Sequence, residues 1–123
     1  MPEYKLGTME LRFAELIWAN EPVTSRDLVA LCEAKLGWKK STTFTVLKRL
    51  CQKGLFQNER GTVTSLVSQD EFDAHQSEEF VAESFGGSLP RFLVAFTSRN
   101  RLSDREIEEL EQLIEAHRKE QSP

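Results

Sequence analysis

Residues 41–54 read STTFTVLKRLCQKG, and this stretch decides the fold. Apolar residues recur in it at helical spacing, at Phe44, Val46, Leu47, Leu50 and Cys51. Ser41 or Thr42 is expected to cap the start of the helix, because a side-chain hydroxyl there can accept from a backbone N–H. Gly54 stands where the residue after a helix tolerates a positive φ. We therefore predict a helix from Ser41 or Thr42 to the residues before Gly54.

Two further helices are predicted upstream of this stretch. Residues 8–19 carry apolar residues at helical spacing, namely Leu11, Phe13, Ala14, Leu16, Ile17 and Trp18. After the turn Asn20-Glu21-Pro22, Thr24 is a good N-cap for a second helix that ends near Gly37. Its apolar stripe consists of Leu28, Leu31 and Cys32.

A β-hairpin is predicted downstream of the same stretch. Residues 56–60 and 63–67 flank the turn Arg60-Gly61-Thr62, and the second arm alternates apolar with polar residues. Three helices followed by a hairpin is the order of a winged helix-turn-helix, in which the third helix enters the major groove of DNA.

The rest of the chain reads as three helices. Ser68 with Glu71 and Ser103 with Glu106 form capping boxes, Gly86-Gly87 ends the first of these helices, and residues 89–97 are almost wholly apolar. We predict a mainly α (α+β winged helix) fold, with a DNA-binding domain over residues 1–67 and a three-helix dimerisation domain over residues 68–123.

The net charge of −4 hides a split between the two parts of the chain. Residues 1–67 hold ten Lys and Arg against seven Asp and Glu, a charge of +3, whereas residues 68–123 hold six against thirteen, a charge of −7. Basic residues gather between Lys35 and Arg60, where Glu59 is the one acidic residue. A compact basic footprint on an acidic protein is typical of a part that reads DNA joined to a part that does not.

Six residues are candidates for contact with double-stranded DNA. They are short hydroxyl and long cationic side chains of the third helix and the hairpin turn: Ser41, Thr42, Thr45, Lys48, Arg49 and Arg60. Thr42, Thr45 and Arg49 share one helix face, because they are spaced i, i+3 and i+7. Hydroxyls can donate to phosphates or base edges, a threonine methyl can touch a thymine methyl, and the helix N-terminus favours phosphate.

Large apolar residues crowd the last three helices and predict a homodimer. They are Phe80, Phe85, Leu89, Phe92, Leu93, Phe96, Leu110 and Ile114. Three short helices cannot easily bury all of them, and leaving four exposed forgoes several kcal/mol, at about 1.5–3 kcal/mol each. A twofold partner would cover them and present two winged helices to a palindrome. The alternative is that these helices fold back on the first domain.

Other classes of protein find little support in the sequence. Cys32 and Cys51 lack C-x-x-C spacing, so we interpret both as buried thiols, and His75 and His117 are expected at the surface. We predict no metal site, no cofactor and no catalysis. No apolar run approaches the roughly 20 residues of a membrane span, and residues 1–8 lack a signal-peptide core, so we expect no membrane insertion and a cytoplasmic location.

Several of these residues resemble the penicillinase and methicillin-resistance repressors, the BlaI/MecI/CopY family. The likeness covers nearly the whole chain and lies in Leu6 to Trp18, Trp38 followed by Thr42, Thr45 and Arg49-Leu50, Lys53-Gly54, Gly86-Gly87, Leu89 to Phe96, and Leu102 to Leu110. The resemblance implies a winged-helix repressor of β-lactamase, penicillin-binding-protein or copper-transport genes, with an interlocking helical dimer domain. Its β-lactam branch is inactivated through a membrane sensor-protease, with cleavage at an Asn-Phe bond.

The chain departs from that family pattern at several points. The pair that matches the cleaved bond is Ala95-Phe96, so the asparagine is missing, and no cysteine follows Cys51 to make the C-x-C motifs of the copper branch. Ser41 and Phe44 stand where relatives often have basic side chains. Two other functions stay open: a ligand-sensing regulator with an effector pocket between the domains near Trp18, Phe85 and Phe92, and a protein-interaction module.

Overall fold

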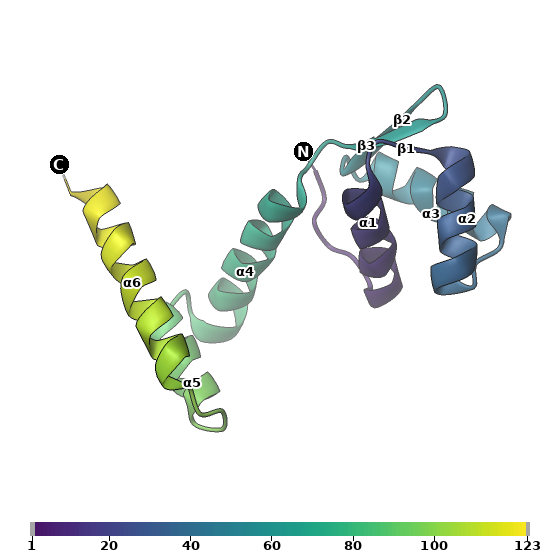
Figure 1. Cartoon of the computed structure of the whole chain (residues 1–123). Coiled ribbons are helices and arrows are strands. Elements are labelled where there is room, and N and C mark those ends of the chain that lie inside the picture. The colour runs from purple at the N-terminus through teal and green to yellow at the C-terminus, as the bar shows by residue number, and fades with distance from the viewer. Residues whose placement is uncertain (1, 123) are drawn as a thin grey trace. The chain divides into compact units, whose positions relative to one another are not determined.

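Six helices and three short strands make up the chain in the computed structural model, which describes residues 2–122 (Figure 1). The elements are α1 (Thr8–Asn20), β1 (Val23–Thr24), α2 (Ser25–Leu36), α3 (Lys40–Gln52), β2 (Phe56–Glu59), β3 (Thr62–Ser65), α4 (Gln69–Phe85), α5 (Leu89–Thr97) and α6 (Asp104–Gln121). They form two compact units, one ending at Glu79 and the other beginning at Phe80. The predicted mainly α winged-helix class is confirmed. The functional boundary expected at Ser68 stays a prediction.

The sheet of the first unit is antiparallel in the order β1-β3-β2. Glu59 pairs with Thr62, so Arg60 and Gly61 alone form the turn, with φ values of 53° and 85°. Two positive φ values are typical of a type I′ turn, which matches the twist of the strands. The predicted three-residue turn was therefore one residue too long. β1 was not predicted, because its pairing of Val23 with Val63 joins residues far apart in the sequence.

One hydrophobic core holds the first unit together. Its fully buried side chains come from α1, α2, α3, the sheet and the connection between α3 and β2, and the largest are Phe13, Phe56, Ile17, Leu28, Leu50, Leu55 and Val63. Trp18 packs against Phe56 and Phe72 with ring centroids 5.4 and 5.3 Å apart, and its Nε1 donates to the carbonyl of Val67 at 2.9 Å. Because Phe72 belongs to α4, this contact fixes the first turn of α4 to the winged-helix core.

Most helix ends follow the predicted caps, and α3 is the exception. The Thr24 and Ser103 side chains cap α2 and α6 by accepting from Asp27 N and Glu106 N. The predicted cap of α3 at Ser41 or Thr42 was wrong, because the helix begins at Lys40 and its N-cap is Lys39. Trp38 stacks on Phe13 at 5.4 Å and fixes the chain just before this start. Packing in the core therefore overrides the local preference for a hydroxyl.

The second unit contains the end of α4 together with α5 and α6. Four phenylalanines, Phe80, Phe85, Phe92 and Phe96, form a chain of ring contacts with centroids 5.4–6.0 Å apart. Within the described part of the chain, α5 and α6 contribute no buried residue. Over residues 2–122, none of the helices combines the length and the apolar character that crossing a membrane requires.

Candidate nucleic-acid interface

The third helix presents a polar and cationic face to solvent. Thr43, Val46, Leu47 and Leu50 are buried against the core. All five α3 residues predicted for DNA contact are exposed, namely Ser41, Thr42, Thr45, Lys48 and Arg49. Gln52 is exposed as well and was missed, although its spacing of seven residues from Thr45 puts it on the same face.

Helix geometry refines what Thr45 can do chemically. Its Oγ1 donates to the Ser41 carbonyl at 2.9 Å, so the hydroxyl hydrogen is used inside the helix. The oxygen lone pairs and the methyl group remain for an external partner. Thr45 is therefore suited to accept from an amino group of a base or to touch an apolar group, and less suited to donate to a phosphate.

Arg49 is tied to α1 through Glu10. Its Nη1 lies 3.4 Å from Glu10 Oε2, and Lys53 Nζ lies 3.7 Å from Glu10 Oε1 while donating to the Lys5 carbonyl at 2.6 Å. A hydrogen bond from the Gly7 N–H, together with the charges of Lys53 and Arg49, holds the pKa of Glu10 below its ordinary value against the effect of burial. A DNA phosphate that binds Arg49 would therefore have to displace Glu10 or bind Arg49 together with it.

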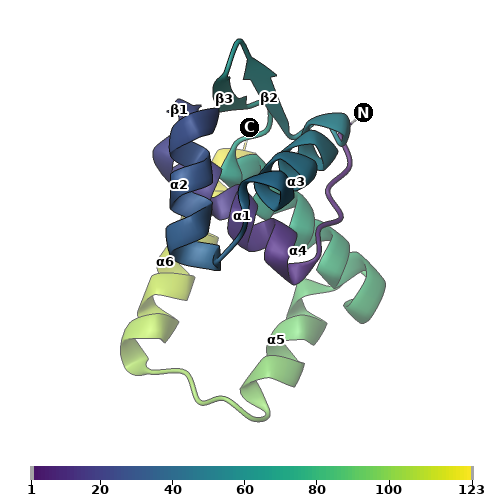
Figure 2. The same ribbon diagram turned by 90° about the vertical axis from the view of Figure 1, so that its right-hand side faces the viewer.

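The hairpin turn places Arg60 at its tip. Arg60 is exposed and adopts a left-handed conformation, which a residue with a side chain adopts at a cost. The Gly61 carbonyl accepts from Ser25 N at 2.8 Å, and Asn58 Oδ1 accepts from Gly61 N at 3.1 Å. The turn is therefore fixed to the start of α2, while Figure 2 shows the hairpin projecting beyond the ends of α2 and α3.

Two shallow hollows lie between the start of α2, the exposed face of α3 and the hairpin. A hollow of about 350 Å³ lies between α2 and α3 and is lined by Ser25, Arg26, Val29, Lys40 and Phe44. A second hollow of about 370 Å³ lies between α3 and β2 and is lined by Phe44, Leu47, Lys48, Cys51 and Asn58. The start of α2, the exposed face of α3 and the hairpin therefore adjoin one another.

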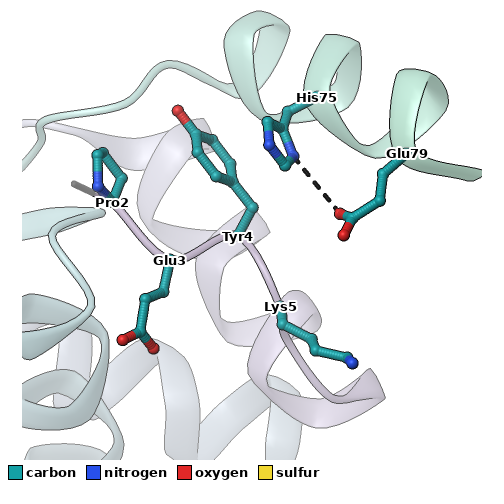
Figure 3. Close-up of a pocket in the computed structure, with 6 residues that line it drawn as sticks. All are labelled: Pro2, Glu3, Tyr4, Lys5, His75 and Glu79. Atoms are coloured by element: carbon teal, nitrogen blue, oxygen red, sulfur yellow. Dashed lines mark ion pairs between the residues drawn. The ribbon is translucent and has the colours of Figure 1, made fainter.

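A different hollow lies between the N-terminal arm and α4 (Figure 3). The Tyr4 ring stacks on His75 with centroids 3.9 Å apart, and Gln76 Nε2 donates to the Tyr4 carbonyl at 2.6 Å. His75 was expected at the surface, but it is half-buried under Tyr4, and its Nδ1 lies 3.7 Å from Glu79 Oε2. No local pattern predicts this packing, because the arm has no periodicity of its own.

Cys32 and Cys51 are not joined in a disulfide, and burial raises the pKa of each thiol. Cys32 is buried as predicted, whereas Cys51 is half-buried because it lies beside the hollow between α3 and β2. Within residues 2–122, His, Cys, Asp and Glu side chains form no cluster of three that could hold a metal ion.

The second unit exposes much of its apolar surface. Of the residues predicted for dimerisation, Phe80, Leu89, Phe96 and Ile114 are exposed, and Phe85, Phe92, Leu93 and Leu110 are half-buried. Val94, Ile107 and Leu113 are exposed too and were not predicted for this role. Among them, Ile107 shares the face of Leu110 and Ile114 at spacings of i, i+3 and i+7, a pattern visible in the sequence.

The Ala95–Phe96 peptide bond lies inside α5. Ser98 Oγ donates to the Ala95 carbonyl at 2.7 Å, and Asn100 N donates to the Phe96 carbonyl at 3.0 Å. The side chains of Ala95 and Phe96 are both exposed. The side chains of this bond are therefore accessible, while its backbone is held in helical geometry.

Known proteins match this chain over almost its full length. A sequence profile described as penicillinase repressor matches residues 6–116. The penicillinase repressor of Bacillus licheniformis is 25% identical over 118 residues, which cover 93% of this chain and 92% of that protein. The methicillin resistance regulatory protein MecI of Staphylococcus aureus strain Mu50 is 23% identical over 115 residues, covering 90% and 94%. An uncharacterized 16.5 kDa protein of Latilactobacillus sakei is 28% identical over 116 residues, covering 91% and 80%.

Proposed function

The chain belongs to the penicillinase repressor family, and from this premise we propose that it is a homodimeric transcriptional repressor that binds palindromic operator DNA. The observation that carries the proposal is the exposed face of α3. It offers hydroxyls and cations between the start of α2 and the hairpin, the arrangement that a major groove accepts.

The conformation of Arg60 supports a role for the hairpin. A left-handed arginine costs about 1–2 kcal/mol, which a glycine or asparagine would largely avoid. Residues strained in this way cluster at functional sites. We assign Arg60 to a phosphate beside the groove that α3 occupies.

The exposed apolar residues of the second unit support the homodimer. Seven large apolar side chains there are at least 40% exposed, namely Phe80, Leu89, Val94, Phe96, Ile107, Leu113 and Ile114. Such a density exceeds the scattered apolar residues of an ordinary surface and is typical of an interaction site. Two linked copies would also bind a palindrome about 10² to 10⁴ times more tightly than one.

A salt titration tests the DNA-binding part of the proposal. The full-length protein is titrated against a random-sequence duplex by fluorescence anisotropy at several salt concentrations. We expect a steep fall in affinity with salt, and Lys48→Ala should reduce the slope by about 0.9 for each protomer that contacts the duplex. Lys119→Ala, in the last turn of α6, is the matched control and should leave the slope unchanged.

The outcome separates DNA binding from the other functions considered. A flat salt dependence would refute the repressor proposal and favour a protein-interaction module. A steep dependence that Lys48→Ala leaves intact would show that DNA binds at another surface. Sedimentation equilibrium on the same samples reports the dimer separately.

A further inference from the structure

Phe44 is an exposed aromatic residue on the face of α3 proposed for DNA. It is 37% exposed, although phenylalanines of this unit such as Phe13 and Phe56 are almost completely buried. Both hollows of the surface are lined by Phe44, so its ring forms an apolar ridge between them. A ring held in this place offers an apolar contact to whatever binds the surface.

The surroundings of Phe44 are cationic. Lys40 Nζ lies 6.0 Å from the ring centroid, Arg26 lines the hollow on one side, and Lys48 lines the hollow on the other. An apolar ridge between positive side chains complements a polyanion that also carries apolar groups. In the major groove, the 5-methyl of thymine is such a group, and phenylalanine is among the side chains that contact it.

We propose that Phe44 is a specificity-determining residue that packs on the 5-methyl group of thymine in each half-site. The inference rests on the proposed function, because it requires α3 to enter the major groove. Phe44 would then read sequence, while the flanking cations position the duplex through its phosphates.

Replacing thymine by uracil provides the sharpest test, because it removes the methyl group alone. Duplexes are first selected from a random library with the full-length protein, and each thymine is then replaced by deoxyuridine. We expect one or two positions in each half-site at which uracil weakens wild-type binding by about four-fold, and about fifteen-fold when both half-sites are changed.

Variants of Phe44 test whether this side chain is the one that contacts the methyl group. Phe44→Ala should bind thymine and uracil duplexes equally at those positions, and Phe44→Leu should restore part of the discrimination because it keeps an apolar side chain. The salt slope of both variants should equal that of the wild type. Leu66→Ala removes an apolar residue outside α3 that is more exposed than Phe44, 54% against 37%, and should leave the discrimination unchanged.

The possible results are distinguishable. If wild-type protein binds no duplex, the proposed function fails and this inference fails with it. If it binds but uracil has no effect, or if Phe44→Ala keeps the full discrimination, the inference alone is overturned. A folded Phe44→Ala variant that loses binding to a polyglutamate peptide but keeps the thymine preference would also overturn it, because the ridge would then serve an acidic protein partner.

Discussion

Truncation of Ile114 to alanine should weaken the dimer by about 30-fold. Ile114 is 54% exposed in the single chain, so about half of its side chain remains to be covered by a partner. Full burial of a large aliphatic side chain stabilises by about 1.5–3 kcal/mol, which leaves about 1 kcal/mol for the exposed half. The change occurs in both protomers of a twofold dimer, so the loss is about 2 kcal/mol.

Sedimentation equilibrium of wild type and Ile114→Ala over a range of concentrations measures this loss directly. Gln112→Ala is the matched control, because Gln112 is an exposed polar residue of the same helix. Circular dichroism checks that both variants keep their helices. An unchanged dimer dissociation constant for folded Ile114→Ala would refute the assignment of this face to the dimer.

Three further substitutions have expected outcomes. Glu10→Gln should destabilise the fold by about 0.5 kcal/mol at pH 7. Because the pKa of Glu10 is lowered in the folded state, the stabilisation is present at neutral pH and lost as the pH falls through the lowered pKa, so denaturant unfolding should show equal stabilities in strong acid. Trp18→Phe removes the Nε1 donor of the Val67 carbonyl and should cost about 1–2 kcal/mol in the same assay; a loss near zero would contradict the role of this bond. Arg60→Gly should raise stability by about 1 kcal/mol while weakening DNA binding, so a variant that gains stability without losing affinity would count against the phosphate contact.

Local sequence patterns were sufficient to predict most of the fold. The helix periods, the caps at Thr24 and Ser103, and the glycines that end α2 and α3 depend on residues a few positions apart, so the sequence displays them. The turn at Arg60-Gly61 was located for the same reason, although its length was misjudged.

Features that depend on distant residues were not predicted. The strand β1 exists because Val23 meets Val63, and the arm at Tyr4 is ordered by His75 and Phe72. Neither pairing leaves a local pattern. In the candidate interface, the sequence identified five exposed residues of α3 but missed Gln52 and placed Phe44 on the apolar side, although both are exposed. It could not show that Glu10 engages Arg49, because the two are 39 residues apart.

The hydrogen bond from Ser25 N to the Gly61 carbonyl has a consequence for operator choice. It connects the hairpin to α2, the helix that leads into α3, so the distance between the hairpin and α3, the two elements proposed to contact DNA, has little freedom to adjust. If the distance between the hairpin and α3 cannot change, the duplex has to adapt its groove width to fit both elements. Base steps that bend or narrow at low energetic cost would then be favoured at positions that no side chain touches, and the operator would carry a preference for DNA flexibility alongside its contacted bases.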